Sequence, residues 1–328
     1  MELIKTEFAS IGVVTSLIGG RSENQDYYGF RDTPLGQAVV VCDGMGGMQG
    51  GQVASTIAVT TILNALAAES VETNPVNALD DAIKLANATI IETGNKDPNL
   101  YGMGTTVTAL ILSKTCATVA FVGDSRIYQL RGHKKVFRTF DHSMVFEMVK
   151  NGVMTEEQAR LSEQSNLILK ALGVYQDIEP EIYMLPYLKD DRFVLCSDGF
   201  WGAMPEKEFL SLISDRSDKI ANIIECTASE IERIGRSKGG NHDNLTAAII
   251  DVKCNSLMKV KMSNTVKAII AALVLLLAIS VTLNIYQLCK SSTQMNKTEQ
   301  TEQAEQKDSD NKDDEESEDA KKGAEDGK

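Results

Sequence analysis

The sequence predicts an α+β fold in which helices pack outside antiparallel β-sheet, and three observations support this prediction. Apolar runs rich in β-branched residues alternate irregularly with segments of helical periodicity. Two of the runs, 105–112 and 115–122, are separated only by Ser113 and Lys114, which is the spacing of a β-hairpin. Two helical segments follow one another between the second and third strands. Because each helix must bury its apolar stripe, we expect layers, with sheet inside and helices outside.

The individual elements follow from local patterns along the chain. Strands are expected at 11–16, 37–42, 105–112, 115–122, 127–130, 192–196 and 245–252. Helices are expected at 52–68, 77–93, 144–151, 155–161, 206–213 and 219–234. In the second of these helices, Leu79, Ile83, Ala86 and Ile90 form one apolar stripe. No tandem repeat is present in the sequence.

Charge and cysteine content exclude some classes of protein. The net charge of the 328 residues is −13, and residues 290–328, with 13 acids and 7 lysines, contribute −6 of it. This balance does not suggest a basic face for nucleic acid. The six cysteines are scattered without a C-x-x-C pair, so we interpret them as buried thiols in a reducing compartment. The N-terminal sequence lacks the profile of a secretory signal.

An uncharged, apolar run of 22 residues spans 268–289. A helix of about 20 apolar residues crosses a bilayer, so the run predicts a single transmembrane helix; a buried core helix is the alternative. Lysines are more frequent before the run than after it, which favours a cytoplasmic leading domain and an outer tail. The predicted parts are a domain at 1–253, a basic linker at 254–267, the membrane span and an acidic, disordered tail at 290–328. The expected location is the cell membrane.

Acidic residues recur where apolar runs end. Asp43, Asp124 and Asp198 each close such a run beside a glycine, and Asp243 precedes the run 245–252. Asp-Gly pairs are also common in turns, which is the alternative for any one of them. Carboxylates that converge in a low dielectric repel one another, so they require raised pKa values or bound cations. Oxygen-only ligands favour Mg²⁺ or Mn²⁺.

Seven short motifs occur in a fixed order along residues 8–252. They are R-S-E-N-Q-D (21–26), V-V-V-C-D-G-M-G-G (39–47), G-T-T (104–106), V-G-D-S-R (122–126), D-H-S (141–143), C-S-D-G (196–199) and H-D-N (242–244). This series resembles the metal-dependent protein serine/threonine phosphatases of the PP2C family in their bacterial form. The resemblance implies a four-layer α-β-β-α sandwich of two antiparallel sheets, with a binuclear metal centre at one edge. It also implies a mobile flap at about 143–183.

The resemblance assigns metal ligands among the acids. It implies that Asp43 bridges two ions, Mn²⁺ or Mg²⁺, that the Gly44 carbonyl binds one of them, and that Asp198 and Asp243 complete the set. Asp124 would hold a weaker third ion together with Asp198, or else fix a turn. The reaction implied is direct attack on phosphorus by a water that bridges the two ions.

The resemblance also assigns the groups that act on substrate and water. Arg21 would clamp the phosphoryl group, as its guanidinium fork fits phosphate oxygens, although a surface salt bridge to Glu23 or Asp26 is the alternative. Asp26 would act on the attacking water. Three positions depart from the family pattern: Gln25 stands for a glutamate, Met45 for a proton-donating histidine of eukaryotic relatives, and Gly202 for an aspartate.

Two histidine-containing motifs invite other interpretations. Asp141, His142 and Ser143 are consecutive, and neighbouring side chains of an extended segment point in opposite directions, so they do not form a hydrolase triad. We expect them to support the adjacent loop. His242 is interpreted as a solvent-facing loop residue rather than as the general acid; water would serve as the proton donor.

The expected function is removal of phosphate from phosphoserine and phosphothreonine of proteins, opposing a bacterial serine/threonine kinase. The expected partners are phosphoproteins, that kinase and its substrates. A catalytically silent phosphoprotein-binding module on the same fold is the alternative. A further alternative is that the acidic tail senses envelope signals rather than extending a plain anchor.

Overall fold

The computed structural model describes residues 1–4, 10–46, 49–258 and 272–285. The chain divides into two compact units, Met1–Val260 and Lys261–Lys328. All helices and strands named below belong to the first unit.

Two antiparallel sheets form the centre of this unit. The first has the order β1-β2-β12-β11-β8-β9 and the second the order β10-β7-β6-β4-β3, with β5 paired to β4. The strands of the first sheet are Glu2–Ile4 (β1), Ser10–Leu17 (β2), Arg126–Arg131 (β8), Lys134–Arg138 (β9), Asp191–Cys196 (β11) and Leu245–Val252 (β12). Those of the second are Asp26–Thr33 (β3), Gly36–Met45 (β4), Gly104–Thr105 (β5), Val107–Leu112 (β6), Ala117–Val122 (β7) and Glu181–Leu185 (β10).

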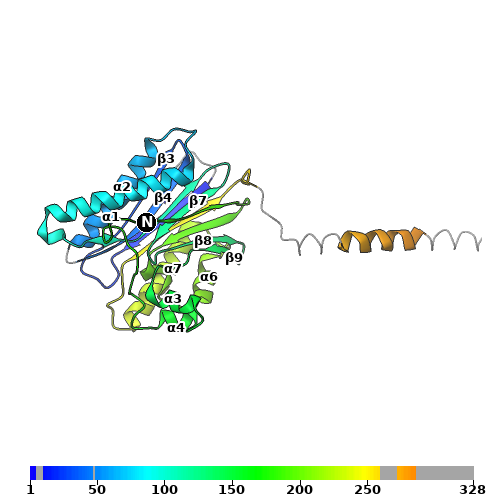
Figure 1. Ribbon diagram of the computed structural model, residues 1–328. Coiled ribbons are helices and arrows are strands. Elements are labelled where there is room, and N and C mark those ends of the chain that lie inside the picture. The colour runs from blue at the N-terminus through cyan, green and yellow to red at the C-terminus, as the bar shows by residue number, and fades with distance from the viewer. Residues whose placement is uncertain (5–9, 47–48, 259–271, 286–328) are drawn as a thin grey trace, which may run out of the picture. The chain divides into compact units, whose positions relative to one another are not determined.

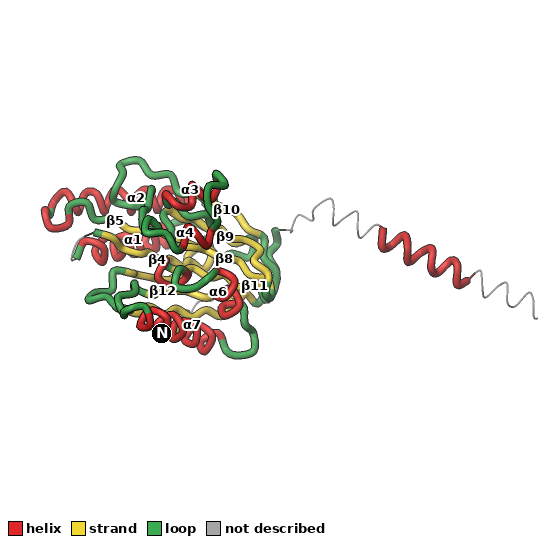
Figure 2. The backbone as a smooth tube through the Cα atoms, turned by 90° about the horizontal axis from the view of Figure 1, so that it is seen from below, coloured by secondary structure: helices red, strands yellow, loops and turns green. Residues whose placement is uncertain are grey.

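Helices cover the outer face of each sheet, as Figures 1 and 2 show. Gly50–Ala67 (α1) and Pro75–Lys96 (α2) lie over the second sheet, and Glu206–Ile213 (α6) and Ile220–Ser237 (α7) lie over the first. Shorter helices are Pro98–Leu100 (η1), Met144–Lys150 (α3), Glu156–Arg160 (α4) and Asp198–Trp201 (α5).

Three hydrophobic clusters confirm that the fold has four layers. One cluster joins α1 and α2 to the second sheet, one joins α6 and α7 to the first, and one lies between the two sheets. Strand β4 illustrates how one sheet contributes to two layers of core. Val40 belongs to the cluster under the helices, whereas Val39 and Val41 belong to the cluster between the sheets. A strand buried on both faces needs a continuous apolar sequence, and residues 38–42 supply it.

Most predicted elements are confirmed, with shifted ends. The predicted hairpin exists, but β6 and β7 pair Leu112 with Ala117, so four residues connect them rather than two. The predicted strand 105–112 is divided into β5 and β6 at Thr106.

The sequence did not predict β1, β3, β9, β10 or α5. Strand β3 is an edge strand of mixed polarity, DYYGFRDT, without clean alternation, and its pairing with β4 fixes its structure. Short edge strands of this kind carry little local signal.

The predicted membrane span, 268–289, lies partly outside the described residues. Its described part, 272–285, is helical, and Leu275 and Leu277 within it are more than half exposed. Within the described ranges, no helix combines the length and the apolar character needed to cross a membrane. The predicted tail, 290–328, lies entirely outside the described residues, as does most of the linker 254–267.

Candidate active site

The predicted site residues meet at one end of the two sheets because of strand register. In the second sheet, Asp26 at the start of β3 pairs directly with Asp43 near the end of β4. In the first sheet, β11 ends where β12 begins, since Cys196 pairs with Ala247, and this brings the flanking Asp198 and Asp243 to the same edge. The end of an antiparallel strand always meets the start of its neighbour.

Asp43 lies within a strand rather than at its end, contrary to the prediction. Strand β4 continues to Met45 because Gly44 and Met45 pair with β5. The Thr105 hydroxyl donates to the Asp43 carbonyl at 2.8 Å, and the Asp43 amide donates to the Thr106 hydroxyl at 3.0 Å. The G-T-T motif therefore fixes the backbone of the predicted bridging ligand, a role that the sequence did not reveal.

Gly44 is required by a close backbone approach. A Cβ atom built there would lie 2.0 Å from the Gly51 carbonyl oxygen, at the start of α1, so no larger residue fits. The Gly44 amide donates to the Gln25 carbonyl, which also accepts from the Ser55 hydroxyl at 2.7 Å. This contact holds β3, β4 and α1 together next to the acids.

Asp26 is buried between the sheets and hydrogen-bonded. Ser197 donates from its hydroxyl to Asp26 Oδ2 at 2.8 Å. Burial raises the pKa of Asp26 to about 7, against the smaller lowering effect of hydrogen bonds from Thr246 and Ser197. A carboxyl with such a pKa exchanges its proton near neutral pH.

Burial also raises the pKa values of the other central acids. The pKa of Asp43 lies well above its ordinary range, first through burial and then through the charges of Asp26 and Asp198. The pKa of Asp124 is raised by burial and by Asp198, and that of Asp198 to about 6 by burial and by Asp243. Each ionised carboxylate thus disfavours the ionised form of its neighbours, as expected for acids that share a cation.

Two buried carboxylate oxygens without hydrogen-bond partners indicate that this site suits a bound cation. Asp124 Oδ1 and Asp198 Oδ1 are buried, and neither has a hydrogen-bond partner among the described residues. A buried, unpaired carboxylate oxygen is costly unless a cation satisfies it. With Asp43 and Asp26 nearby, the donor set is all oxygen, which suits Mg²⁺ or Mn²⁺.

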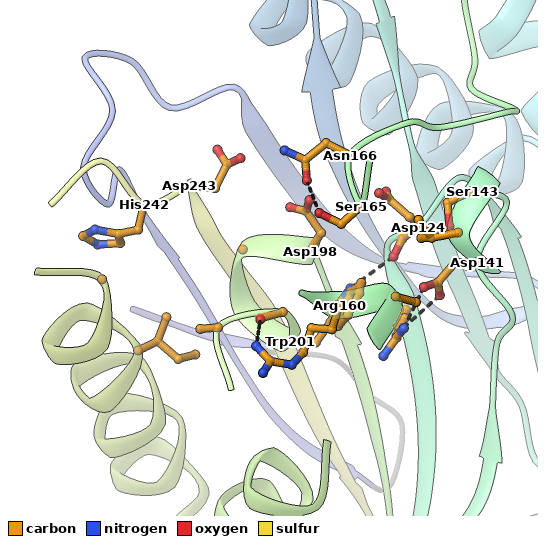
Figure 3. Close-up of a pocket in the computed structure, with 18 of the residues that line it drawn as sticks. Asp124, Asp141, Ser143, Arg160, Ser165, Asn166, Asp198, Trp201, His242 and Asp243 are labelled. Carbon is orange, nitrogen blue, oxygen red and sulfur yellow. Dashed lines mark hydrogen bonds and ion pairs between the residues drawn. The ribbon is translucent and has the colours of Figure 1, made fainter. Parts of the chain in front are cut away.

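These acids are close but do not form a preformed ligand cage. Among the described residues, no three acidic, histidine or cysteine side chains lie together in metal-ligand geometry. One reason is that Asp243 is turned to Arg21, whose Nη2 donates to Asp243 Oδ2 at 2.9 Å. Figure 3 shows Asp243 directed away from Asp198 and Asp124.

Arg21 is at the rim of the site, and both partners of its ion pair are more than a third exposed. The predicted alternatives, Glu23 and Asp26, are not its partners in the structure. Its loop is held by Asn244, whose Oδ1 accepts from the Gln25 amide while its Nδ2 donates to the carbonyls of Ile18 and Glu23, all at 2.8–3.0 Å. This role of Asn244 was not predicted from the sequence.

A cavity of about 670 Å³ contains the predicted groups. Arg21, Asp43, Gly44, Asp124, Asp198 and Asp243 all line it, together with Met45 and Gln25. Asp26 does not line the cavity but lies behind Asp43. The structure therefore gathers every predicted site residue at one place, although their roles remain predictions.

His242 lies in a loop as predicted, but the prediction that it faces solvent was wrong. Its side chain is only 15% exposed, and its ring lies against Gly235 of α7, where a Cβ atom would come within 2.2 Å of the ring. Its Nε2 is 3.3 Å from Glu232 Oε1. Because the ring is turned from the acids toward α7, His242 is neither solvent-facing nor placed as a proton donor (Figure 3).

The D-H-S motif has the structural role that we expected. Asp141 accepts two hydrogen bonds from the Arg126 guanidinium, at 2.8 and 2.6 Å, and the pair is buried. The Ser143 side chain caps α3. His142 packs on Phe121, and its Nδ1 accepts from the Gly123 amide at 3.2 Å, which supports the turn that carries Asp124.

The predicted flap returns to the site after α4. Leu172 forms a bridge with Thr105, and Asn166 and Ile168 line the site cavity. This places the segment beside the acids, while its mobility remains a prediction.

Comparisons with known proteins agree with this geometry. A family model described as protein phosphatase 2C matches residues 15–231. The serine/threonine phosphatase stp of Listeria monocytogenes is 33% identical over 71% of this chain and 88% of its own length. Protein phosphatase PhpP of Streptococcus pneumoniae is 30% identical over 74% of this chain and 97% of its own.

Solved structures share the fold. The serine/threonine phosphatase PstP/Ppp of Mycobacterium tuberculosis is 27% identical with a TM-score of 0.65, over 74% of this chain and 99% of that one. The catalytic domain of PstP in complex with two manganese ions matches with a TM-score of 0.64 and 27% identity, over 74% of this chain and 98% of that one. By the family model and by the identity to curated relatives, this chain belongs to the protein phosphatase 2C family.

Proposed function

We propose that this protein removes phosphate from phosphoserine and phosphothreonine residues of proteins in a reaction that depends on divalent cations. The observation that carries the proposal is the meeting of Asp43, Asp124, Asp198, Asp243 and Arg21 around one cavity. Acids for cations and a guanidinium for phosphate are the two requirements of phosphoryl transfer. The relatives in the family are named serine/threonine phosphatases, which supports the same activity.

The cation ligands are proposed to be Asp43, the Gly44 carbonyl, Asp198 and Asp243, and Asp124 would add a weaker third position with Asp198. Two bound Mn²⁺ or Mg²⁺ ions would supply an activated water and neutralise phosphoryl charge. Gly202 supports the lower affinity of the third position, because it offers no carboxylate there; its amide instead donates to the Asp198 carbonyl at 2.7 Å.

The chain's own groups would bind the phosphoryl group and move the proton. The Arg21 guanidinium, which donates to Asp243 in this structure, would bind two phosphoryl oxygens when Asp243 binds a cation instead. Asp26, which pairs with Asp43 across β3 and β4 and has a pKa of about 7 in the absence of cations, would act on the attacking water. Met45 lines the cavity and has no proton to give, so the leaving oxygen would receive its proton from solvent.

The test is hydrolysis of p-nitrophenyl phosphate and of a phosphothreonine peptide by the purified full chain. We expect turnover with Mn²⁺, loss of turnover with chelator and recovery when Mn²⁺ is restored. Asp43→Asn should abolish activity, whereas Asp80→Asn on the exposed surface of α2 should not. Absence of turnover of both substrates across Mn²⁺ and Mg²⁺ concentrations would reject the proposal.

Membrane attachment is proposed separately. The support is the uncharged run 268–289, preceded by more lysines than follow it. The catalytic unit would then be cytoplasmic, where it would act on substrates of a serine/threonine kinase. Fractionation of cells should find the full chain with membranes and a chain ending at 258 in the soluble fraction; equal distribution of the two would refute the anchor.

A further inference from the structure

A second cavity, of about 360 Å³, adjoins the candidate active site, and most of the residues that line it have no part in the proposed chemistry. It shares Arg21, Asp124, Asp198 and Asp243 with the site cavity, so the two are continuous. Figure 3 shows its walls, which come from the predicted flap on one side and from α5 and α7 on the other. Whatever binds at the acids can therefore extend into this space.

Much of the wall of this second cavity is apolar. Phe146 of α3, Ala159 of α4, Trp201 of α5, and Ile231 and Ile234 of α7 contribute to it. These residues come from four separate helices that share no local sequence pattern. Apolar side chains that surround a space beside a polar site are typical of a ligand pocket.

Trp201 is fixed in the wall of this cavity by two contacts. The Arg126 guanidinium lies 3.3 Å from the centre of the Trp201 ring, and the indole Nε1 donates to the Asp124 carbonyl at 3.1 Å. Arg126 is in turn neutralised by Asp141. Trp201 therefore connects the apolar wall to the backbone of a proposed cation ligand.

The charged groups around this space are mostly engaged with one another. Arg160 donates to Glu157 and to the Gly202 carbonyl, and Glu156 pairs with Arg138. Lys238 contacts the Ala203 carbonyl at 3.4 Å and has no ion-pair partner in the described part of the chain. Away from the proposed cation ligands, the carboxylates of this lining, Asp141 and Glu156, are paired with arginines, so an uncharged, apolar group fits this part of the cavity best.

We propose that this second cavity binds one large apolar side chain of the phosphoprotein substrate, close in sequence to the phosphorylated residue. The inference rests on the proposed function. An extended peptide advances about 3.3–3.6 Å per residue, so the neighbouring cavity is reached within a few positions of the phosphoester. Its volume is at the lower limit of ligand pockets, about 300 Å³, which suits one side chain.

The experiment compares phosphothreonine peptides in which a single leucine is moved through the three positions on each side of the phosphothreonine. The reference peptides carry alanine or aspartate at the same positions. We expect one position at which leucine raises kcat/KM about tenfold or more over alanine, the discrimination usual for apolar pockets. p-Nitrophenyl phosphate is measured in parallel, since it has no flanking residues.

Two variants and a matched control locate the effect. Ile234→Ala enlarges the cavity and Ala203→Leu fills it, and both should reduce the leucine preference while leaving p-nitrophenyl phosphate hydrolysis unchanged. Leu210→Ala is the control, because Leu210 and Ile234 pack against the same core cluster but only Ile234 lines the cavity. It should keep the preference.

Trp201 supplies a binding signal independent of turnover, as it is the single tryptophan of the sequence. Unphosphorylated peptide with leucine at the preferred position should change its fluorescence at lower concentration than the alanine peptide does. Turnover of p-nitrophenyl phosphate with no leucine preference at any position would overturn this inference alone, as would equal effects of Ile234→Ala and Leu210→Ala. No turnover of either substrate class would overturn the proposed function and this inference with it.

Discussion

The raised pKa of Asp26 makes a quantitative prediction about stability in the absence of cations. The unfolded chain releases this proton near the ordinary value of 3.8, whereas the folded protein retains it up to about pH 7. Between these values the folded state binds more protons, so stability falls as pH rises and levels off above about pH 7. A shift of this size corresponds to about 4 kcal/mol, of which about 2 kcal/mol falls between pH 5 and 7, since the group is still half protonated at pH 7.

The assay is urea unfolding of the chelator-treated full chain at pH 5, 6, 7 and 7.5. Asp26 should account for a loss of about 2 kcal/mol of unfolding free energy in wild type from pH 5 to 7, and Asp198 should add to this loss because its pKa is raised to about 6. His142 acts in the opposite direction, because burial lowers its pKa. Asp26→Asn removes one titrating group without removing the hydrogen bond that Ser197 donates, so the difference between the two proteins isolates Asp26.

Asp81→Asn, at an exposed position of α2, is the control and should keep the wild-type pH dependence. Added Mn²⁺ should stabilise the protein more at pH 7.5 than at pH 5, since protons and cations compete for the same oxygens. A wild-type stability that is flat or rises between pH 5 and 7 would contradict the reasoning, and so would an Asp26→Asn variant with the same slope.

Three further substitutions test individual contacts. Arg21→Lys loses the guanidinium fork and should lower kcat/KM about tenfold or more, chiefly because KM rises. An unchanged KM for p-nitrophenyl phosphate would argue against the phosphate clamp. Asn244→Ala removes three hydrogen bonds of the loop that carries Arg21, at about 1 kcal/mol each, so the melting temperature should fall by several degrees and kcat/KM should fall as well; a fall only in melting temperature would show a purely structural role. Arg126→Met leaves Asp141 buried without its partner and should cost about 3–5 kcal/mol in urea unfolding at pH 7.5, whereas a change below about 1 kcal/mol would refute the importance of the pair.

The candidate site illustrates which residues a sequence can reveal. Asp43, Asp198 and Asp243 stand next to apolar runs, and the ends of buried strands are recognisable from composition alone. Asn244 and Thr106 act through backbone groups that are 63 to 226 positions away in sequence, as in the Thr106–Asp43 and Asn244–Ile18 contacts. Their side chains look like ordinary loop residues until the strands are paired.

The sequence by itself determined the central strands, the main helices and the acids that face one another, because burial demands apolar runs and each run has a definite end. Only the tertiary structure decided the course of the edge strand β3, the turning of His242 onto α7 and the pairing of Arg21 with Asp243. It also created the apolar cavity beside the acids from α3, α4, α5 and α7. The physical reason is that local composition reports how deeply a residue is buried, whereas partners are chosen by register and packing between distant segments.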